Sequence, residues 1–166
     1  MRCGTTLRVV GGLARRSGRR RGSVAAVRFD FRHVNRLKMP TKHVLVCEDD
    51  LSSQARIAQH LAQLFEPQGE VVVSYVSGAL AACGILALDT VDLIILDHDM
   101  PRGNGPDLLV WLASQGRKVP VMTFSGIVGN NAALQALGAE HLFGKEDVIS
   151  GRADANIRSI LGLPPA

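Results

Sequence analysis

Two short apolar runs of this chain, HVLVC at 43–47 and LIIL at 93–96, are bordered by acidic side chains. The acids are Glu48, Asp49, Asp50, Asp92, Asp97 and Asp99. An all-apolar run that ends in acids is typical of a buried parallel strand whose carboxyl end opens on solvent. In an open α/β sheet that edge is where ligands bind, so we expect the functional site there.

Carboxylates that meet at such an edge raise one another's pKa, because each like charge within ~4–6 Å disfavours ionisation of its neighbours. A cation has to compensate them. A hard divalent ion such as Mg2+ takes oxygen ligands and keeps several water molecules, which an incoming phosphate can replace. The acidic strand ends therefore predict a Mg2+ site.

From His43 onward, apolar runs alternate with segments whose apolar residues have helical spacing. The expected strands are 43–47, 70–75, 91–96, 119–124 and 141–143. The expected helices are one through Ile57, Leu61, Leu64 and Phe65 that stops at Pro67 and Gly69, then about 78–88, 106–114, 129–137 and 150–161. Such alternation predicts an α/β, doubly wound fold, in which right-handed crossovers place five helices on the two faces of a five-stranded parallel sheet.

Functional side chains stand at the ends of four of these strands. Glu48 and Asp49 follow the first strand, Asp97 the third, Ser125 the fourth and Lys145 the fifth. A carboxylate can attack phosphorus and form an aspartyl phosphate. The transfer then needs positioning and charge neutralisation, which Mg2+, an ammonium and a hydroxyl can supply. The pattern therefore favours phosphoryl chemistry.

Four segments within about residues 42–162 carry a resemblance to a known family. They are VLVCEDD, LIILDHDMPRGNG, PVMTFSG and GAEHLFGK, in this order. The chain resembles the receiver domain of two-component response regulators, whose DxxMPxxxG motif the second segment matches. This resemblance implies a flavodoxin-like fold with strand order 2-1-3-4-5. It also implies that Asp97 accepts a phosphoryl group from a histidine kinase or a histidine phosphotransfer protein.

The resemblance implies further roles around that acceptor. Glu48, Asp49 and Asp97 would hold Mg2+ together with the backbone carbonyl of Asp99. Ser125 and Lys145 would contact the phosphoryl oxygens. The protein would then be a regulatory phosphoacceptor that catalyses only its own phosphotransfer and dephosphorylation, and it would signal to a downstream protein by altered binding.

Two positions depart from the family pattern. Glu146 and Asp147 follow the lysine, where the family has a proline after a cis bond. A cis bond before a residue other than proline costs ~3 kcal/mol, so we expect a trans bond and a differently shaped loop. Leu142 occupies the position of the usual switch aromatic. Any switch through Ser125 and Leu142 would work by packing, because leucine has no ring hydroxyl.

Two other functions are compatible with parts of this pattern. The first is a haloacid-dehalogenase-like phosphatase with Asp97 and Asp99 as its DxD motif. In that class the DxD motif precedes the acid pair and a threonine is preferred where this chain has Met100, so the chain order argues against it. The second is a pseudo-receiver that serves only as a docking module and takes up no phosphoryl group.

Simpler structural roles explain several polar residues near these motifs. We expect Asp50 to cap the first helix, because aspartate favours that position and the helix dipole favours its charge. His98 should point away from the pocket, since adjacent strand residues face opposite sides. Thr123 should be a structural core residue, because it lies two residues deeper than Ser125.

Positive charge is concentrated in the first part of the chain. Residues 1–40 hold eleven Lys and Arg and one acid, whereas residues 41–166 hold eight basic and fourteen acidic side chains. We expect 1–40 to be a disordered basic extension and 41–166 to be the receiver domain. An organelle transit peptide, a basic arm for nucleic acid, or translation from upstream of a true start at Met39 would explain the extension, and we favour the last.

The acidic globular part is expected to bind neither DNA nor a membrane. The uncharged stretch 71–88 changes from β-branched to Ala/Leu-rich residues at Ser77 and Gly78, which predicts strand, turn and helix and not a membrane span. Three cysteines without CxxC spacing fit a reducing compartment, so we expect a cytoplasmic protein. Because the sequence ends soon after the last expected helix, we expect a stand-alone receiver without an output domain.

Overall fold

A computed structural model of the chain describes residues 41–65 and 71–165. The strands are β1 (Lys42–Cys47), β2 (Val71–Val76), β3 (Leu93–Leu96) and β4 (Val121–Thr123). The helices are α1 (Leu51–Phe65), α2 (Ala79–Leu88), α3 (Gly105–Ser114), α4 (Val128–Ala136), α5 (Lys145–Ile149) and α6 (Asp154–Ile160). The expected basic extension, the stop at Pro67 and Gly69, and the first residue of the strand expected at 70–75 lie outside the described residues.

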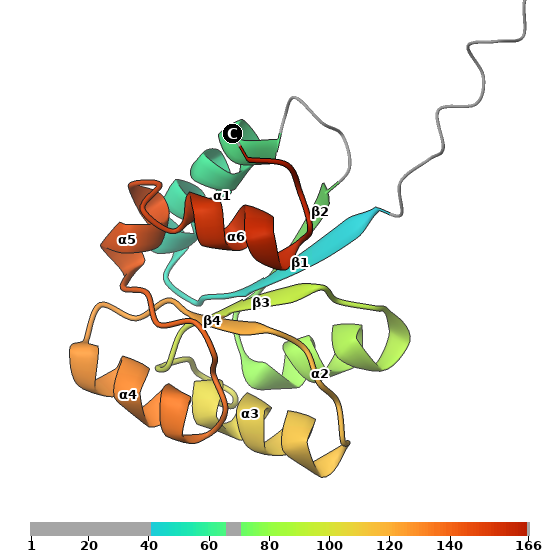
Figure 1. Cartoon of the computed structure of the whole chain (residues 1–166). Helices are drawn as coiled ribbons and strands as arrows, with labels where there is room; N and C mark the ends of the chain where they lie inside the picture. The colour runs from blue at the N-terminus through green and yellow to red at the C-terminus, as the bar shows by residue number, and fades with distance from the viewer. Residues whose placement is uncertain (1–40, 66–70, 166) are drawn as a thin grey trace, which may run out of the picture. The chain divides into compact units, whose positions relative to one another are not determined.

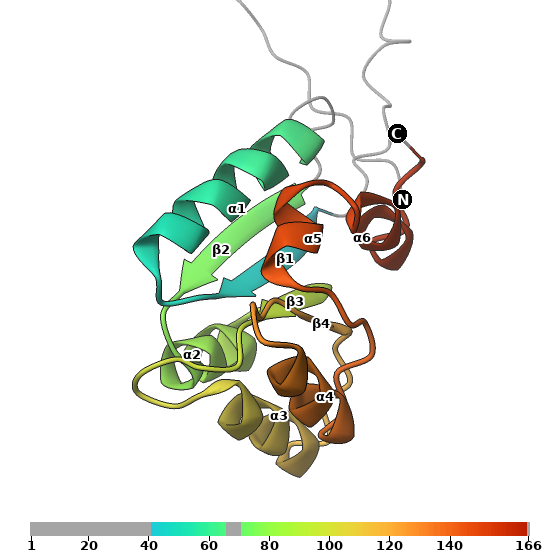
Figure 2. The ribbon, with the colours of Figure 1, turned by 90° about the vertical axis from the view of Figure 1, so that its left-hand side faces the viewer.

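The described strands form one parallel sheet in the order β2-β1-β3-β4. Helices α1, α5 and α6 cover one face of the sheet, and α2, α3 and α4 cover the other (Figures 1 and 2). This arrangement confirms the predicted α/β fold with a doubly wound parallel sheet. Helices on both faces are the expected result of right-handed crossovers between parallel strands.

Burial on both faces explains why the central strands are continuously apolar. Val44 and Val46 of β1 pack in the core beneath α1, whereas Leu45 and Cys47 pack in the core beneath α2 and α3. β3 alternates in the same way between the two cores. Since successive side chains point to opposite faces, a strand that is covered on both sides has no position for a charge. Acids can follow only where the strand ends.

The expected fifth strand at 141–143 is wrong in the described part of the chain. Only isolated bridges join this segment to the sheet, at Met122 with His141 and at Ser125 with Gly144. Between them the Thr123 hydroxyl accepts the backbone N–H of Phe143 at 2.8 Å and donates to its carbonyl at 2.9 Å. The side chain thus takes hydrogen bonds that a backbone ladder would use. Thr123 is fully buried, as expected for a structural residue.

The expected last helix at 150–161 is found only in part, as α6, which begins at Asp154. A short helix that was not expected, α5, precedes it and begins at Lys145. Gly151 separates them with φ +84°, a left-handed conformation that glycine adopts without steric cost and that ends helices. The described residues therefore contain six helices and four strands instead of five of each. None of these helices is both long and apolar enough to cross a membrane.

Gly105 allows α3 to start directly against the end of β3. A Cβ atom on Gly105 would lie 2.4 Å from the backbone oxygen of Asp97 and 3.2 Å from the Cα of His98. Gly105 itself donates its N–H to the His98 carbonyl at 2.9 Å. The absence of a side chain here therefore fixes the position of the loop that follows Asp97.

We expect Gly105→Ala to lower the free energy of unfolding by about 1–3 kcal/mol, because the added methyl group overpacks against backbone. Gly129→Ala is the matched control, since a Cβ there meets nothing within 4 Å. The control should change stability by less than about 1 kcal/mol, and in the stabilising direction. Urea unfolding followed by circular dichroism measures both. Equal stability of the two variants would contradict the close approach at Gly105.

Candidate functional site

The register of the sheet brings the acids of the first and third strands together. Cys47 pairs with Leu96, so the residues that follow them, Glu48 and Asp97, leave the sheet side by side. Both side chains are buried, and Asp49 is partly buried. One carboxylate oxygen of each of the three acids lies within 4.8 Å of the other two. The carboxyl edge of the sheet thus holds three carboxylates in one cluster.

Lys145 connects two of these acids. Its Nζ atom lies 2.6 Å from Oε2 of Glu48 and 2.9 Å from Oδ2 of Asp97. The ammonium also lies 5.4 Å from the centre of the Phe124 ring, within the range of a cation–π contact. Lys145 is the first residue of α5, and its backbone N–H donates to the Ser125 carbonyl at 3.3 Å. The bridge to Ser125 therefore places the lysine beside the acids.

Burial and charge shift the pKa values of this pair. Burial, the largest cause, and the neighbouring charge of Asp97 raise the pKa of Glu48 above its usual value, although Lys145 and the Asp50 N–H favour ionisation. Burial lowers the pKa of Lys145, but its contacts with Glu48 and Asp97 outweigh this and raise it overall. The lysine therefore stays protonated. When all three carboxylates are ionised, its single positive charge leaves the cluster with a net negative charge.

The two oxygens of Asp97 have different partners. Oδ1 accepts the backbone N–H of His98 at 2.8 Å, and Oδ2 accepts from Lys145. The His98 side chain is partly buried, and its Nδ1 lies 2.8 Å from Oδ1 of Asp99. The exposed Asp99 side chain also accepts from Asn130 at 2.7 Å, so its carboxylate stands apart from the cluster. The proposed role of the Asp99 backbone carbonyl stays a prediction.

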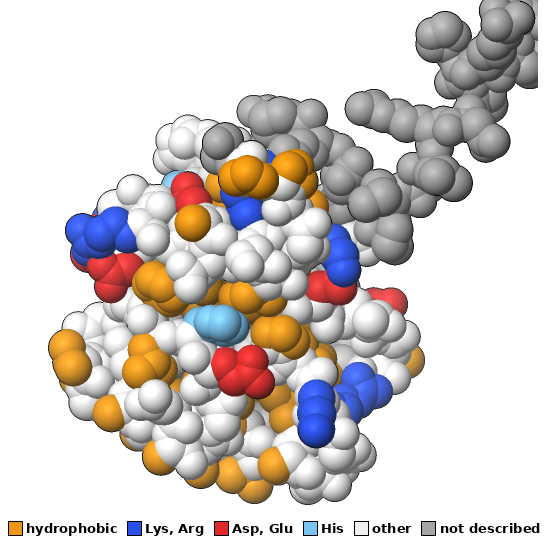
Figure 3. All heavy atoms as spheres, in the orientation of Figure 1, with side chains coloured by type: hydrophobic (Ala, Val, Ile, Leu, Met, Phe, Trp, Pro, Cys, Tyr) orange, Lys and Arg blue, Asp and Glu red, His pale blue; other side chains and the backbone are white. Residues whose placement is uncertain are grey.

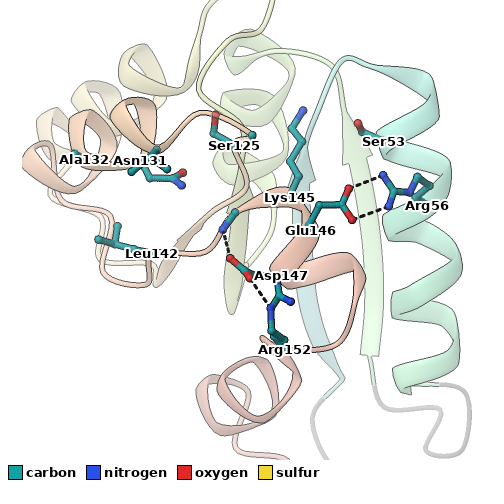
Figure 4. A pocket seen from close by; sticks show the side chains of 13 residues that line it. Ser53, Arg56, Ser125, Asn131, Ala132, Leu142, Lys145, Glu146, Asp147 and Arg152 are labelled. Carbon is teal, nitrogen blue, oxygen red and sulfur yellow. Dashed lines mark hydrogen bonds and ion pairs between the residues drawn. The ribbon is translucent and has the colours of Figure 1, made fainter.

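A cavity of about 570 Å3 opens beside Lys145, between α1, α4 and α5 (Figure 4), and the three clustered acids do not line it. Its lining includes Ser53, Arg56, Ser125, Asn131, Leu142 and Lys145. Ser125 is buried, and its hydroxyl accepts the N–H of Ile127 at 3.3 Å. Leu142 is 42% exposed and lines the same cavity. The structure thus places both expected switch residues around one opening next to Lys145.

An ion pair holds the segment that departs from the family pattern. The Glu146 carboxylate accepts hydrogen bonds from the two terminal guanidinium nitrogens of Arg56 at 2.9 and 3.0 Å, and this pair joins α5 to α1 (Figure 4). This contact lowers the pKa of Glu146. Asp147 accepts the Gly144 N–H at 2.9 Å and binds Arg152, and the first of these contacts is the main cause of its lowered pKa. No described peptide bond is cis, as expected for this loop.

Two other acids lie outside the cluster. Asp50 caps α1, as expected: its Oδ1 accepts from the Ser52 hydroxyl and from the Ser53 N–H, both at 2.7 Å, and these contacts lower its pKa to about 2. Asp92 lies at the opposite end of β3, where it binds Lys42 at 2.9 Å. Asp92 was expected within a strand at 91–96, but β3 begins only at Leu93, so this acid precedes the strand and lies at the opposite edge of the sheet from the cluster.

Sequence reasoning did not identify Arg56, Ser53 or Asn131 as parts of this site. They stand on α1 and α4, and only the three-dimensional packing brings them to the cavity beside Lys145. Arg56 offers the one usable signal, because it is the only Lys or Arg of α1 and lies two turns after the acids.

The donor set fits a hard divalent cation. Three carboxylates within reach of one ion offer the oxygen ligands that Mg2+ prefers. A single ammonium compensates only part of their charge, and burial raises the pKa of Glu48 in spite of the contact with Lys145. A second cation at the exposed side of the cluster would supply what is lacking.

Comparisons with known proteins agree with this arrangement. A family model described as response regulator receiver domain matches residues 44–148. A protein-glutamate methylesterase/protein-glutamine glutaminase from Nocardioides sp. (strain ATCC BAA-499 / JS614) is 33% identical over 103 residues, which cover 61% of this chain and 27% of that protein. The chain therefore spans only about a quarter of the length of this curated relative.

Solved structures show the same fold. A Francisella response regulator receiver domain has 23% identity and a TM-score of 0.60, with 74% of this chain and 98% of that chain covered. The receiver domain of a sensor histidine kinase from Pseudomonas aeruginosa PAO1, with a magnesium ion coordinated in its active-site cleft, has 18% identity and a TM-score of 0.63 over the same shares of the two chains. Because the family model covers more than half of the sequence, this chain belongs to the response regulator receiver domain family.

Proposed function

We propose that this protein is a phosphoacceptor of a two-component phosphorelay and that Asp97 receives the phosphoryl group. One observation carries the proposal: Asp97 is buried at the end of β3, with one oxygen held by Lys145 and the other by a backbone N–H. Such a fixed carboxylate can present a lone pair to phosphorus without reorganising. Membership of the receiver family supports a histidine kinase or a histidine phosphotransfer protein as the donor.

The transfer forms one bond and breaks one. An oxygen of Asp97 attacks the phosphorus of a phosphohistidine, the P–O bond forms, and the P–N bond breaks. The imidazole leaves with the electron pair of that bond and takes up a proton from water. Lys145, which already touches Oδ2 of Asp97, is placed to neutralise the phosphoryl oxygens, and the Ser125 hydroxyl can donate to one of them.

We infer that Glu48, Asp49 and Asp97 hold Mg2+, with the backbone carbonyl of Asp99 as a further ligand. The metal would supply charge neutralisation for the transferred group. The acidic cluster of this chain and the magnesium ion in the related histidine kinase receiver support this assignment.

The protein acts as a regulator and not as an enzyme on an external substrate in this proposal. Its output is altered binding of a downstream protein. Ser125 is drawn toward the phosphoryl oxygens, and the cavity lined by Ser125 and Leu142 changes shape as a result. Because such a switch is a two-state equilibrium, the phosphoryl group shifts it only by binding one state better than the other.

Replacing the acceptor tests the central assignment. With acetyl phosphate and Mg2+, the full chain should gain the mass of one phosphoryl group, and Asp97→Asn should gain none while it keeps the circular dichroism spectrum of the native protein. Asp99→Asn is the matched control and should still be labelled, because its carboxylate stands apart from the cluster. A native chain that stays unlabelled would support the pseudo-receiver, and a labelled Asp97→Asn would place the acceptor elsewhere.

Mg2+ should raise the melting temperature by binding the folded state alone, a stabilisation of about 1.4 kcal/mol at a concentration of about 10 Kd. The raised pKa of Glu48 means that the ionised carboxylate destabilises the metal-free fold above that pKa and does not do so below its unfolded-state value. Protons and Mg2+ compete for Glu48. The Mg2+ effect should therefore be largest near neutral pH and should shrink as the pH falls through the raised pKa.

Thermal melts of Asp49→Ala and Glu140→Ala separate this site from general ionic effects. Asp49→Ala should respond less to Mg2+, whereas Glu140→Ala, which removes an exposed acid outside the cluster, should respond like the native protein. An equal response of all three proteins would argue for nonspecific binding.

The switch is tested with beryllofluoride, a mimic of the phosphoryl group. We expect amide chemical-shift changes clustered over residues 126–150, because Ser125 and Leu142 border the same cavity. Ser125→Ala should suppress these changes more than Leu142→Ala, since only the serine can donate a hydrogen bond to the mimic. Shift changes limited to the acids themselves would count against an output through this surface.

A further inference from the structure

Helix α2 exposes an apolar face that the proposed function does not use. Its ten residues, ALAACGILAL, include no charged side chain. Leu80 is 77% exposed and Leu88 is 87% exposed, although both are leucines on a helix whose other side is buried in the core. Figures 1 and 2 show α2 at the end of its layer, with α3 beside it. Exposed large apolar side chains grouped on one face indicate an interaction surface.

This face has a symmetric pattern about its centre. Gly84 is exposed, and a Cβ there would meet nothing within 4 Å. Leu80 and Leu88 lie four residues before and after it, and exposed alanines, Ala81 and Ala87, lie three residues before and after it. Residues three and four apart share one face of a helix. The order of exposed side chains along α2 is therefore the same in both directions, with glycine at the centre and a leucine at each end.

Charged residues border both ends of the face, and Arg117 also reaches the carboxyl end, where its guanidinium donates to the backbone carbonyl of Leu86. Asp89 follows the carboxyl end of α2 and is exposed. At the amino end, the turn that contains Arg102 packs against the helix, where Ala79 donates its N–H to the Gly103 carbonyl at 2.9 Å. Neither Asp89 nor Arg102 forms an ion pair with another described residue. An antiparallel copy of α2 would place each Arg102 near the other copy's Asp89.

We propose that α2 is a homodimer interface, in which two copies of this chain pair their α2 helices antiparallel about a two-fold axis at Gly84. A two-fold interface must be complementary to itself, and the order of the exposed side chains along α2 meets this demand. Leu80 of one copy packs beside Leu88 of the other, and the two glycines let the backbones approach. The opposed helix dipoles and the two Arg102–Asp89 pairs favour the same direction.

The dimer is weak and concentration-dependent. One helix of ten residues on each side is about 15 Å long, which gives a contact at the small end of specific interfaces. We expect a dissociation constant on the order of 10–1000 μM, with the burial of four leucines as the main contribution. The α2 residues do not line the cavity beside Lys145 and Ser125, so the interface leaves that cavity open.

Sedimentation equilibrium of the full chain over a concentration series tests the interface. The native protein should approach twice the monomer mass at the highest concentrations, and Leu80→Lys and Leu88→Lys should each weaken the dimer at least tenfold. Leu51→Lys is the matched control, because Leu51 is 79% exposed on α1, on the opposite face of the sheet, and its replacement should leave the dimer unchanged. Acetyl phosphate labelling of Leu80→Lys at the native level shows that the variant is folded.

Charge reversal and cross-linking test the antiparallel arrangement. Arg102→Glu should weaken the dimer, and the double variant Arg102→Glu with Asp89→Arg should restore it. In a background with Cys3→Ser and Cys83→Ser, mixing a Leu80→Cys chain with a Leu88→Cys chain should give disulfide-linked dimers. Either chain alone should cross-link poorly.

Three results would overturn the proposal. The first is a native protein that remains monomeric at about 1 mM, the upper end of the predicted dissociation constant. The second is a dimer that Leu80→Lys and Leu88→Lys leave intact, which would place the interface elsewhere. The third is efficient cross-linking of Leu80→Cys with itself, which would indicate parallel helices. A monomeric native protein that binds lipid vesicles through Leu80 would assign the face to a membrane surface instead.

Discussion

The ammonium of Lys145 is the contact on which the site depends, because it lies between two buried carboxylates at 2.6 and 2.9 Å. Without it, Glu48 and Asp97 would stand side by side in a buried position with no compensating charge from a side chain, an arrangement that strongly disfavours ionisation. Lys145 reaches both carboxylates because it is the first residue of α5 and because its backbone N–H donates to the Ser125 carbonyl. A single residue thus links the proposed acceptor Asp97, the metal-ligand candidate Glu48 and the strand end that carries the Ser125 hydroxyl.

Two features hold the segment before and after Lys145 in place. Before it, Thr123 binds both backbone groups of Phe143 and thereby ties the segment to β4 without a regular strand. After it, Glu146 binds Arg56 of α1 in a bidentate ion pair. The residue after Lys145 is a proline in the family pattern. In this chain it is Glu146, whose side chain joins α5 to α1. This exposed ion pair positions α5 relative to α1 but adds little to the free energy of unfolding, because water screens exposed charges.

The sequence was sufficient to predict the parallel α/β fold, because strands covered on both faces must be continuously apolar and acids can follow only at their ends. The same reasoning placed Glu48, Asp49 and Asp97 at one edge. It failed at 141–143, where the hydroxyl of Thr123 competes with the backbone ladder, an effect that no hydrophobic pattern reveals. It also missed the break at Gly151 and the role of Arg56, because both depend on how α5 and α6 pack against α1.

Chemical mapping of the phosphoryl group tests the account most directly. The full chain is treated with acetyl phosphate and Mg2+, the acyl phosphate is reduced with borohydride to leave a homoserine, and tandem mass spectrometry of the peptides locates that residue. We predict one modified position, Asp97, and no modification when Mg2+ is removed by a chelator. Homoserine at Asp49 or Asp99, 2-amino-5-hydroxypentanoic acid at Glu48, or an unmodified chain under conditions that label a known receiver would contradict this assignment.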